Sequence, residues 1–158
     1  MKKTLIQVLT GLAFSMFIVA AASAGPMLQL RLASDSDSED GERMTYVIHN
    51  GQQNSTNVLY VQKTILLDEK MLKSAKARKD AFGHPNISIT FNDTGKKRLA
   101  EVTRENLHKK IAILIDGNIY SAPIIQMEIP DGKIQVSGSF SKEEVDDLVK
   151  KLNTAARQ

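Results

Sequence analysis

The chain has 158 residues, enough for one ordinary domain, and its 42% hydrophobic and 25% charged residues are typical of a folded globular protein. A net charge of +3 and this mixed composition exclude a highly basic nucleic-acid coat and a polytopic membrane protein. There is no cysteine, which excludes disulfides, zinc ribbons and thiol catalysis, and with 5% aromatic residues a stacking platform for bases or sugars is poorly supplied.

The first residues predict a secretory signal rather than part of a domain. Lys2 and Lys3 precede an apolar run over residues 5–22, which ends in a small-x-small pattern at residues 22–24. We expect cleavage after Ala24, and the alternative is an uncleaved anchor, because the run is close to the shortest length that spans a bilayer. Without its two N-terminal lysines the exported chain has 19 basic and 18 acidic residues, a net charge of +1.

Two strands and an acidic loop are predicted for the first part of the exported chain. Leucines alternate with polar residues over residues 28–32, as in a strand with one buried face. Residues 34–42 contain five acids and no apolar side chain, so we predict a solvated loop. Apolar residues alternate again over residues 44–48, and Asn50 and Gly51 form a strong turn signal.

The middle of the chain predicts a strand that leads into a helix. Short apolar runs at residues 58–61 and 65–67 precede an alternation over residues 87–91. Residues 92–94 offer side-chain oxygens that can cap a helix from about Thr94 to His108. Four residues share one face of this helix: Leu99, Val102, Thr103 and Asn106. Two pairs of opposite charges lie four residues apart on it: Lys97 with Glu101, and Glu105 with Lys109.

The last part predicts two hairpins and a second helix. A continuous apolar run over residues 111–115 is of strand length, and residues 116–118 accept the positive φ of a tight turn. The return strand begins at Ile119, and Pro123 marks its edge or a bulge. A second turn at residues 130–132 precedes strand residues 134–140.

Ser141 and Glu144 then form a capping box at the start of the second helix. Apolar residues at helical spacing give this helix one packed face: Val145, Leu148, Val149 and Leu152. This order of elements predicts an α+β domain, with a largely antiparallel sheet and two packed helices.

Four segments in order carry a resemblance to a known family: residues 87–92, 95–106, 111–123 and 134–144. Together they resemble the head subdomain of the first periplasmic domain of SecD, the accessory subunit of the bacterial Sec protein-export machinery. The resemblance runs from about Val58 to Leu152 and implies an extracytoplasmic α+β module. It divides the chain into a signal peptide (1–24), N-terminal strands with the acidic loop (25–57) and a SecD head-like domain (58–155).

In the SecD family the head engages the polypeptide that emerges from the channel, whereas the membrane part supplies proton-driven movement. We find no counterpart of the base subdomain, the transporter helices or the proton-path carboxylate in this sequence. We therefore expect a shared fold and a protein-contacting role rather than a motor. The end of the chain, residues 153–158, departs from the family pattern.

No catalytic, cofactor-binding or metal-binding residues are predicted. His49, His84 and His108 are isolated in sequence and form no ligand pair, so surface or turn positions are favoured over a metal site. The acidic loop is weakly similar to a calcium loop, but Asp40 stands where the loop needs glycine and Tyr46 where it needs glutamate.

Three further patterns have simpler structural explanations. Ser139 and Lys142 have the spacing of a serine nucleophile and its lysine base, but they stand at a helix start and lack companion motifs. Asp116 beside a glycine is first a turn former. Three tripeptides fit the glycosylation rule, and they matter only in a eukaryotic secretory route: those that begin at Asn54, Asn86 and Asn92.

A local excess of basic residues suggests a weak contact with anionic surfaces. Residues 63–110 contain twelve basic and six acidic side chains. They could meet acidic lipid headgroups or acidic polypeptide segments, although a solvated face is the simpler explanation because acids elsewhere cancel the charge. A nucleic-acid partner is not expected, because the chain is exported and its acidic residues nearly cancel its basic ones. The residues concerned are Lys70, Lys73, Lys76, Arg78, Lys79, Lys96, Lys97 and Arg98.

Three functions stay open from the sequence. The first is a non-enzymatic binding module, periplasmic or otherwise extracytoplasmic, that holds an exported polypeptide or partner protein at a sheet edge or groove without a cofactor. The second is a hydrolase or metal-dependent enzyme whose site assembles only in the fold, from at least two of the histidines and nearby carboxylates. The third is a docking or inhibitory subunit of the Sec membrane complex.

Overall fold

The computed structural model describes residues 25–50, 53–138 and 140–158. The predicted signal segment, residues 1–24, lies outside the described residues, as does Gly51 of the predicted turn. Among the described residues, no helix is both long and apolar enough to cross a membrane.

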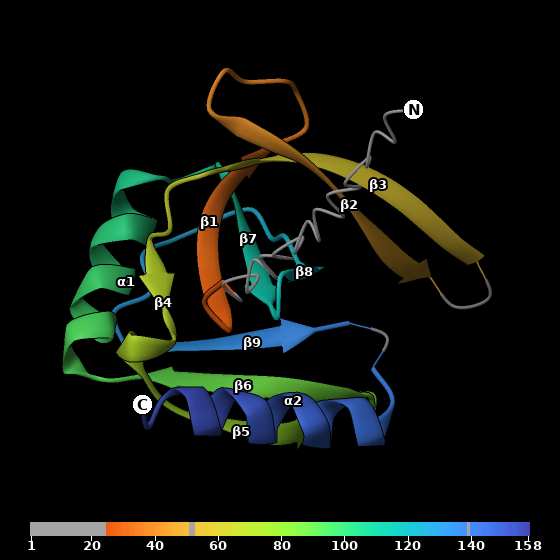
Figure 1. Cartoon of the computed structure of the whole chain (residues 1–158), viewed down its shortest axis with the longest axis vertical. Helices are drawn as coiled ribbons and strands as arrows, with labels where there is room; N and C mark the ends of the chain where they lie inside the picture. The colour runs from red at the N-terminus through yellow and green to blue at the C-terminus, as the bar shows by residue number, and fades with distance from the viewer. Residues whose placement is uncertain (1–24, 51–52, 139) are drawn as a thin grey trace, which may run out of the picture.

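Within this part of the chain the strands form two antiparallel sheets with two α-helices beside them (Figure 1). The larger sheet has the order β2-β3-β1-β7-β8, with the short strand β4 also paired to β1. The smaller sheet has the order β5-β6-β9. The predicted α+β class is confirmed, but the strands are divided between two sheets instead of one. The elements are β1 (Leu28–Ser34), β2 (Gly41–Asn50), β3 (Gln53–Gln62), β4 (Leu67–Asp68), η1 (Glu69–Met71), β5 (Leu72–Lys79), β6 (Pro85–Phe91), α1 (Asp93–Glu105), β7 (Lys110–Ile115), β8 (Asn118–Ser121), β9 (Lys133–Ser137) and α2 (Lys142–Ala155).

Strand β1 is central in the larger sheet, although it lies first among the described elements. It pairs with β3 and β4 on one side and with β7 on the other, in a register that places Leu28 opposite Ile115. The predicted loop between β1 and β2 is exposed over residues 35–40. Two ion pairs join this region to the sheet, Asp35 with Lys110 and Glu42 with the buried Arg31.

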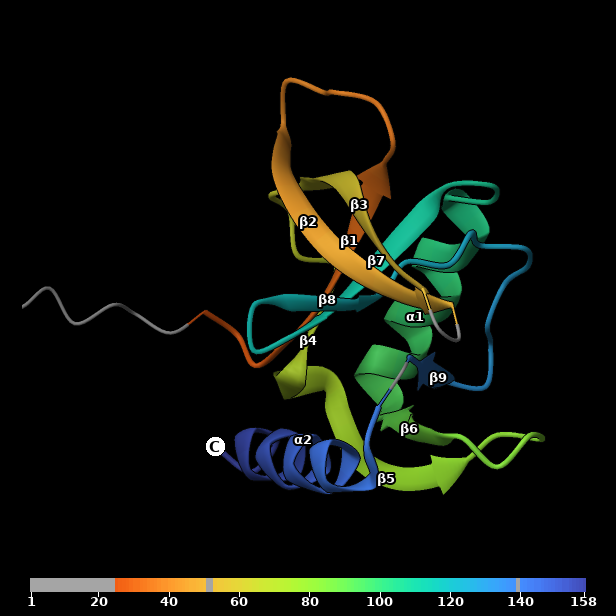
Figure 2. The same cartoon turned by 90° about the vertical axis from the view of Figure 1, so that its right-hand side faces the viewer.

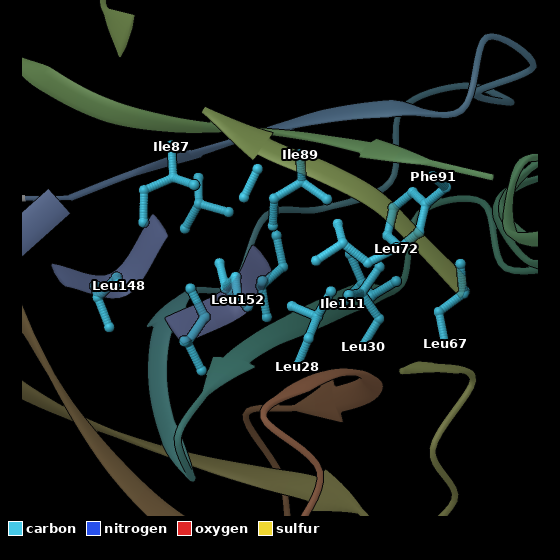
Figure 3. Close-up of a cluster of buried hydrophobic side chains, with 14 of the residues drawn as sticks. Leu28, Leu30, Leu67, Leu72, Ile87, Ile89, Phe91, Ile111, Leu148 and Leu152 are labelled. Carbon is cyan, nitrogen blue, oxygen red and sulfur yellow. The ribbon is translucent and has the colours of Figure 1, made fainter. Parts of the chain in front are cut away.

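The main hydrophobic core lies between the two sheets and the helices. In β6 the alternating residues Ile87, Ile89 and Phe91 are buried, as their spacing predicts. Figure 3 shows these side chains across from Leu28 and Leu30 of β1, with Leu148 and Leu152 of α2 beside them. The core therefore fixes how the smaller sheet and α2 sit against the larger sheet. A second, smaller cluster includes Leu59, Val61 and Leu114 of the larger sheet.

Helix α1 begins as predicted and ends earlier than predicted. The Asn92 side-chain oxygen accepts a hydrogen bond from the Gly95 amide at 2.9 Å, so Asn92 is the N-cap. The helix ends at Glu105 rather than near His108, because the Asn106 side-chain amide donates to the Val102 carbonyl and His108 adopts a φ of 65°. Leu99, Val102 and Thr103 are buried as the helical spacing predicts.

The charge pairs of α1 also differ from the predicted ones. Among the described side chains, Glu101 pairs with Arg98 at 2.7 Å instead of with Lys97. Lys109 lies beyond the helix, and its ammonium donates to the Asn106 side chain rather than pairing with Glu105. The two predicted pairs are therefore wrong.

Helix α2 and the hairpin turns follow the sequence closely. The Ser141 hydroxyl accepts from the Glu144 amide at 3.1 Å, which confirms the predicted N-cap. Asp116 and Gly117 have φ values of 51° and 76° and join β7 to β8 in a two-residue turn. Gly132, with a φ of 70°, precedes β9.

Candidate functional site

A groove of about 800 Å³ lies between the two sheets. We call it the inter-sheet groove. Figure 2 shows the elements that contribute its walls: β2 and β8 of the larger sheet lie above the β5–β6 hairpin and β9 of the smaller sheet. Its walls come from β2, from β8 and the residues after it, from the β5–β6 turn, and from the segment between β9 and α2. The lining residues are Tyr46, Val47, Asp80, His84, Pro85, Tyr120, Ser121, Ala122, Pro123, Ser137, Gly138, Phe140 and Ser141.

Aromatic and apolar side chains dominate this groove. The rings of Tyr120 and Phe140 stack with centroids 5.4 Å apart. Val47 is 49% exposed on the opposite wall, although it belongs to a strand. Burial raises the pKa of the Tyr120 phenol above its ordinary value, and the carboxylates of Glu144 and Asp116 add to the effect. The phenol therefore stays neutral and adds a hydrogen-bonding hydroxyl to a lining that also contains Ser121, Ser137 and Ser141.

The turn between β5 and β6 holds one rim of the groove. The Asp80 carboxylate accepts from the backbone amides of Phe82 and His84 at 2.8 and 2.9 Å, and its other oxygen lies 3.2 Å from the His84 ring. The bond from the His84 amide, followed by that from the Phe82 amide, lowers the pKa of Asp80. This turn carries Phe82, which is 86% exposed, next to residues that line the groove.

A smaller apolar cavity of about 310 Å³ lies farther along β9. Its walls include Leu99 and Thr103 of α1, Ile111 of β7 and the segment that links β8 to β9. Pro123 lines both this cavity and the inter-sheet groove, so the two hollows are neighbours. The linking segment also exposes Ile124 at 47% and Met127 at 70%.

Strands with one hydrogen-bonded neighbour border these hollows. Among the described strands, β2 pairs only with β3, β8 only with β7 and β9 only with β6. Each contributes residues to the inter-sheet groove or to its junction with the linking segment. A groove with apolar walls and free strand edges can bind an extended polypeptide through main-chain hydrogen bonds and side-chain contacts together.

The two histidines whose side chains the structure describes, His84 and His108, do not meet in one site. His84 lines the inter-sheet groove and pairs with Asp80, whereas His108 lines a different hollow beside Asp35 and Lys110. Both are exposed, and the side chain of His49 lies outside the described residues. Among the described side chains, no group of three or more histidines and carboxylates is placed to hold a metal ion. In the acidic loop, the Asp35 carboxylate pairs with the Lys110 ammonium at 2.5 Å.

The remaining sequence patterns have structural roles where the structure describes them. Lys142 pairs with Asp146 at 3.0 Å, and this hydrogen bond raises the pKa of the ammonium, the opposite of what a general base needs. Its predicted partner Ser139 lies outside the described residues. Asp116 forms the β7–β8 turn, with Lys151 at 3.9 Å from its carboxylate.

The basic residues lie on different elements of the fold. Lys73, Lys76 and Arg78 belong to β5, whereas Lys96 and Lys97 belong to α1. No local sequence pattern indicates the features that shape the groove. The stacked rings, the exposed Val47 and the exposed Phe82 arise because the topology brings four distant segments together.

Comparison with known proteins gives one consistent family. Residues 43–156 match the family described as "SecDF, P1 head subdomain". The chain is 44% identical over 91 residues to a protein translocase subunit SecD of Sebaldella termitidis, covering 58% of this chain and 22% of that protein. It is 38% identical over 91 residues to the SecDF subunit of Thermus thermophilus, covering 58% of this chain and 12% of that protein. The chain thus spans about a fifth or less of the length of these curated relatives.

Solved structures support the same fold. A structure of SecDF, described as a membrane component that enhances protein export, superposes with a TM-score of 0.57 and 38% identity, over 59% of this chain and 42% of that chain. A crystal structure of SecDF in a super-membrane-facing form superposes with a TM-score of 0.62 and 26% identity, over 82% of this chain and 19% of that chain.

Proposed function

This chain belongs to the SecDF P1 head subdomain family, and from that premise we propose that it is a non-enzymatic module that binds polypeptide in the inter-sheet groove during protein export. We also propose that it works outside the cytoplasm, where the predicted signal would deliver it. The family connects the chain with protein export, because its relatives are protein translocase subunits. The binding activity is proposed from the site itself.

The observation that carries this proposal is the combination of apolar walls and free strand edges in one groove. Tyr120, which stacks on the buried Phe140, and the exposed Val47 and Phe82 can contact apolar side chains of many sequences. Main-chain hydrogen bonds to a strand edge do not depend on the sequence of the bound segment. Together they suit a protein that meets varied polypeptides.

The chemistry of the groove favours binding over catalysis. Its lining contains one carboxylate and one histidine, Asp80 and His84, and both form part of the β5–β6 turn. The Asp80 carboxylate is occupied by two backbone amides of that turn, which holds it in a structural role. A docking subunit of the Sec membrane complex would also bind a protein. The experiment below distinguishes that alternative from binding of exported polypeptides.

Site-specific photo-crosslinking in the cell envelope tests the proposal. A photoreactive amino acid replaces Val47 in one variant and Phe82 in another, and the matched control replaces Lys150 on the exposed face of α2. We expect a range of exported polypeptides to be trapped from the first two positions and few from the control. Mass spectrometry of the trapped proteins identifies them.

Two results would contradict the proposal. Equal trapping from all three positions would show nonspecific contact, and no trapping above background would show that the groove binds no polypeptide. If subunits of the Sec membrane complex were the main proteins trapped, the chain would instead be a docking subunit of that complex.

A further inference from the structure

We infer that the bound polypeptide adds as an extended strand along the outer edge of β9, with its side chains in the inter-sheet groove and in the neighbouring apolar cavity. This inference rests on the proposed function and specifies how the same site works. It follows from the direction of the peptide groups in β9, from what closes the opposite edge of the same sheet, and from the hollows beside β9.

The hydrogen bonds of β6 fix which peptide groups of β9 point outward. The Phe91 amide donates to the Gly132 carbonyl at 2.9 Å, and these two residues continue the register that pairs Ile89 with Ile134 and Ile87 with Val136. Opposed residues of an antiparallel ladder alternate between hydrogen-bonded and non-hydrogen-bonded pairs. The peptide groups of Ile134 and Val136 therefore face β6. Those of three residues point away from the sheet: Lys133, Gln135 and Ser137.

The other edge of the sheet obeys the same alternation. Since residues 87, 89 and 91 of β6 face β9, residues 86, 88 and 90 face β5, which leaves the peptide groups of Ala75, Ala77 and Lys79 pointing outward. The Ala75 amide donates to the Asn153 side-chain oxygen and the Ala75 carbonyl accepts from the Asn153 amide, both at 2.9 Å. The side chain of Asn153 thus takes the position of a neighbouring strand at Ala75, where α2 packs along β5.

The outer edge of β9 is closed only at its start. The Lys133 amide donates to the Asp131 side chain at 3.1 Å, which limits pairing before this residue. Among the residues that the structure describes, no hydrogen bond joins the amides of Gln135 and Ser137 to another group. Their amides and the adjacent outward carbonyls are therefore available to an added strand.

The surroundings of this edge fit an extended apolar segment. Lys133 and Gln135 line the apolar cavity, and Ser137 lines the inter-sheet groove, so a strand beside β9 would pass from one hollow into the other. Successive side chains of a strand point to opposite faces, so alternate residues could enter these hollows. Lys133 is the single charged residue of β9, and the cavity wall is built mainly from isoleucine, leucine and methionine side chains. The segment that fits is extended, carries little charge and is rich in β-branched residues.

A binding measurement with the full chain tests this inference. The probe is a fluorescent peptide of about nine alternating valine and serine residues, long enough to pass the whole of β9. The variant Gln135→Pro removes one outward amide without removing a bond to β6, and Gln135→Ala keeps that amide as the matched control. We expect the proline variant to bind about fivefold more weakly or worse and the alanine variant to bind within about twofold of the unchanged chain.

A second probe keeps the test valid if the proline variant folds poorly. The same peptide with N-methyl groups on every second residue cannot donate along one edge, so we expect it to bind the unchanged chain about fivefold more weakly or worse. Equal binding of both peptides, or a folded Gln135→Pro variant with unchanged affinity, would overturn edge pairing. If crosslinking at Val47 still succeeded in that case, the proposed function would stand without this mode of binding. A dimer that disappears in Gln135→Pro, without peptide binding, would assign the edge to a second copy and would also overturn the inference.

Discussion

The two edges of the three-stranded sheet differ in how the chain completes them. At β5 the Asn153 side chain of α2 bonds both outward peptide groups of Ala75. At β9 the helix is absent, and the neighbouring linking segment contributes exposed apolar residues instead of hydrogen bonds. An unpaired edge is a site of aggregation unless something covers it, so a protein that covers Ala75 on one edge and leaves Gln135 and Ser137 open on the other separates stability from binding. We expect substitutions at the edge of β5 to lower the free energy of unfolding and substitutions at the edge of β9 to weaken the binding of partners.

The largest effect should come from loosening the helix that closes β5. Leu152 is fully buried between α2 and the sheets, so Leu152→Ala should lower the free energy of unfolding by about 3 kcal/mol through the cavity that it leaves. Urea denaturation followed by circular dichroism measures this loss. Val149→Ala, at a partly buried position of the same helix, should cost about 1 kcal/mol. Equal losses of unfolding free energy at the two positions would show that the packing of α2 does not depend on Leu152 in particular.

The same substitution at both edges gives the most direct comparison. Ala75→Pro removes the amide that Asn153 accepts from, and we expect a loss of about 2 kcal/mol in unfolding free energy. Gln135→Pro, at the corresponding outward position of β9, should cost less than about 1 kcal/mol because no β6 bond depends on that amide. Thermal unfolding of the two variants side by side measures the difference. A larger loss at Gln135 would contradict the assignment of an open edge.

Removing only the closing side chain should have a smaller effect. Asn153→Ala leaves the amide and carbonyl of Ala75 without their partners and should cost about 1–2 kcal/mol. The newly exposed edge should also promote self-association, which analytical ultracentrifugation would detect. Thr154→Ala, next to it on the exposed face, should leave the oligomeric state unchanged. A monomeric and fully stable Asn153→Ala variant would show that the edge needs no closure.

The smallest effect should be local and dependent on pH, at the rim of the groove beside β9. The pKa of Asp80 is lowered, so the support that its carboxylate gives to the β5–β6 turn is complete above the ordinary pKa of aspartate. That support is lost as the pH falls through the lowered value. NMR shifts of the Phe82 and His84 amides should follow this titration, while Asp80→Asn should abolish it. Amide shifts in Asp80→Asn that still titrate with the same midpoint would contradict the assignment.

The sequence predicts elements far better than it predicts the site. Alternation identified β1 and β6, and side-chain oxygens identified the caps at Asn92 and Ser141, because these signals are local. The end of α1 was missed because an asparagine side chain competes for the helix carbonyls at Asn106. The groove could not be predicted, because Tyr120 of the larger sheet and Phe140 after the smaller sheet meet only in the folded chain.

The edge comparison also lay beyond sequence reasoning. Nothing in residues 153–158 indicates that Asn153 would bond to the backbone of Ala75, which lies 78 residues earlier. A strand is recognised in the sequence by its alternating residues, whereas one asparagine side chain that bonds a strand edge produces no such alternation. Which edge stays open follows only from where α2 packs, and that depends on the whole core.

The central place of β1 has a consequence for how the protein comes into being. Strand β1 is synthesised early, but it can pair with β7, some eighty residues later in the chain, only after β7 has been made. A ribosome or an export channel delivers the chain from its N-terminus. A partly delivered chain that ends before Lys110 would therefore expose the apolar side chains of Leu28 and Leu30 to chaperones. Final folding is thereby postponed until most of the polypeptide has been released.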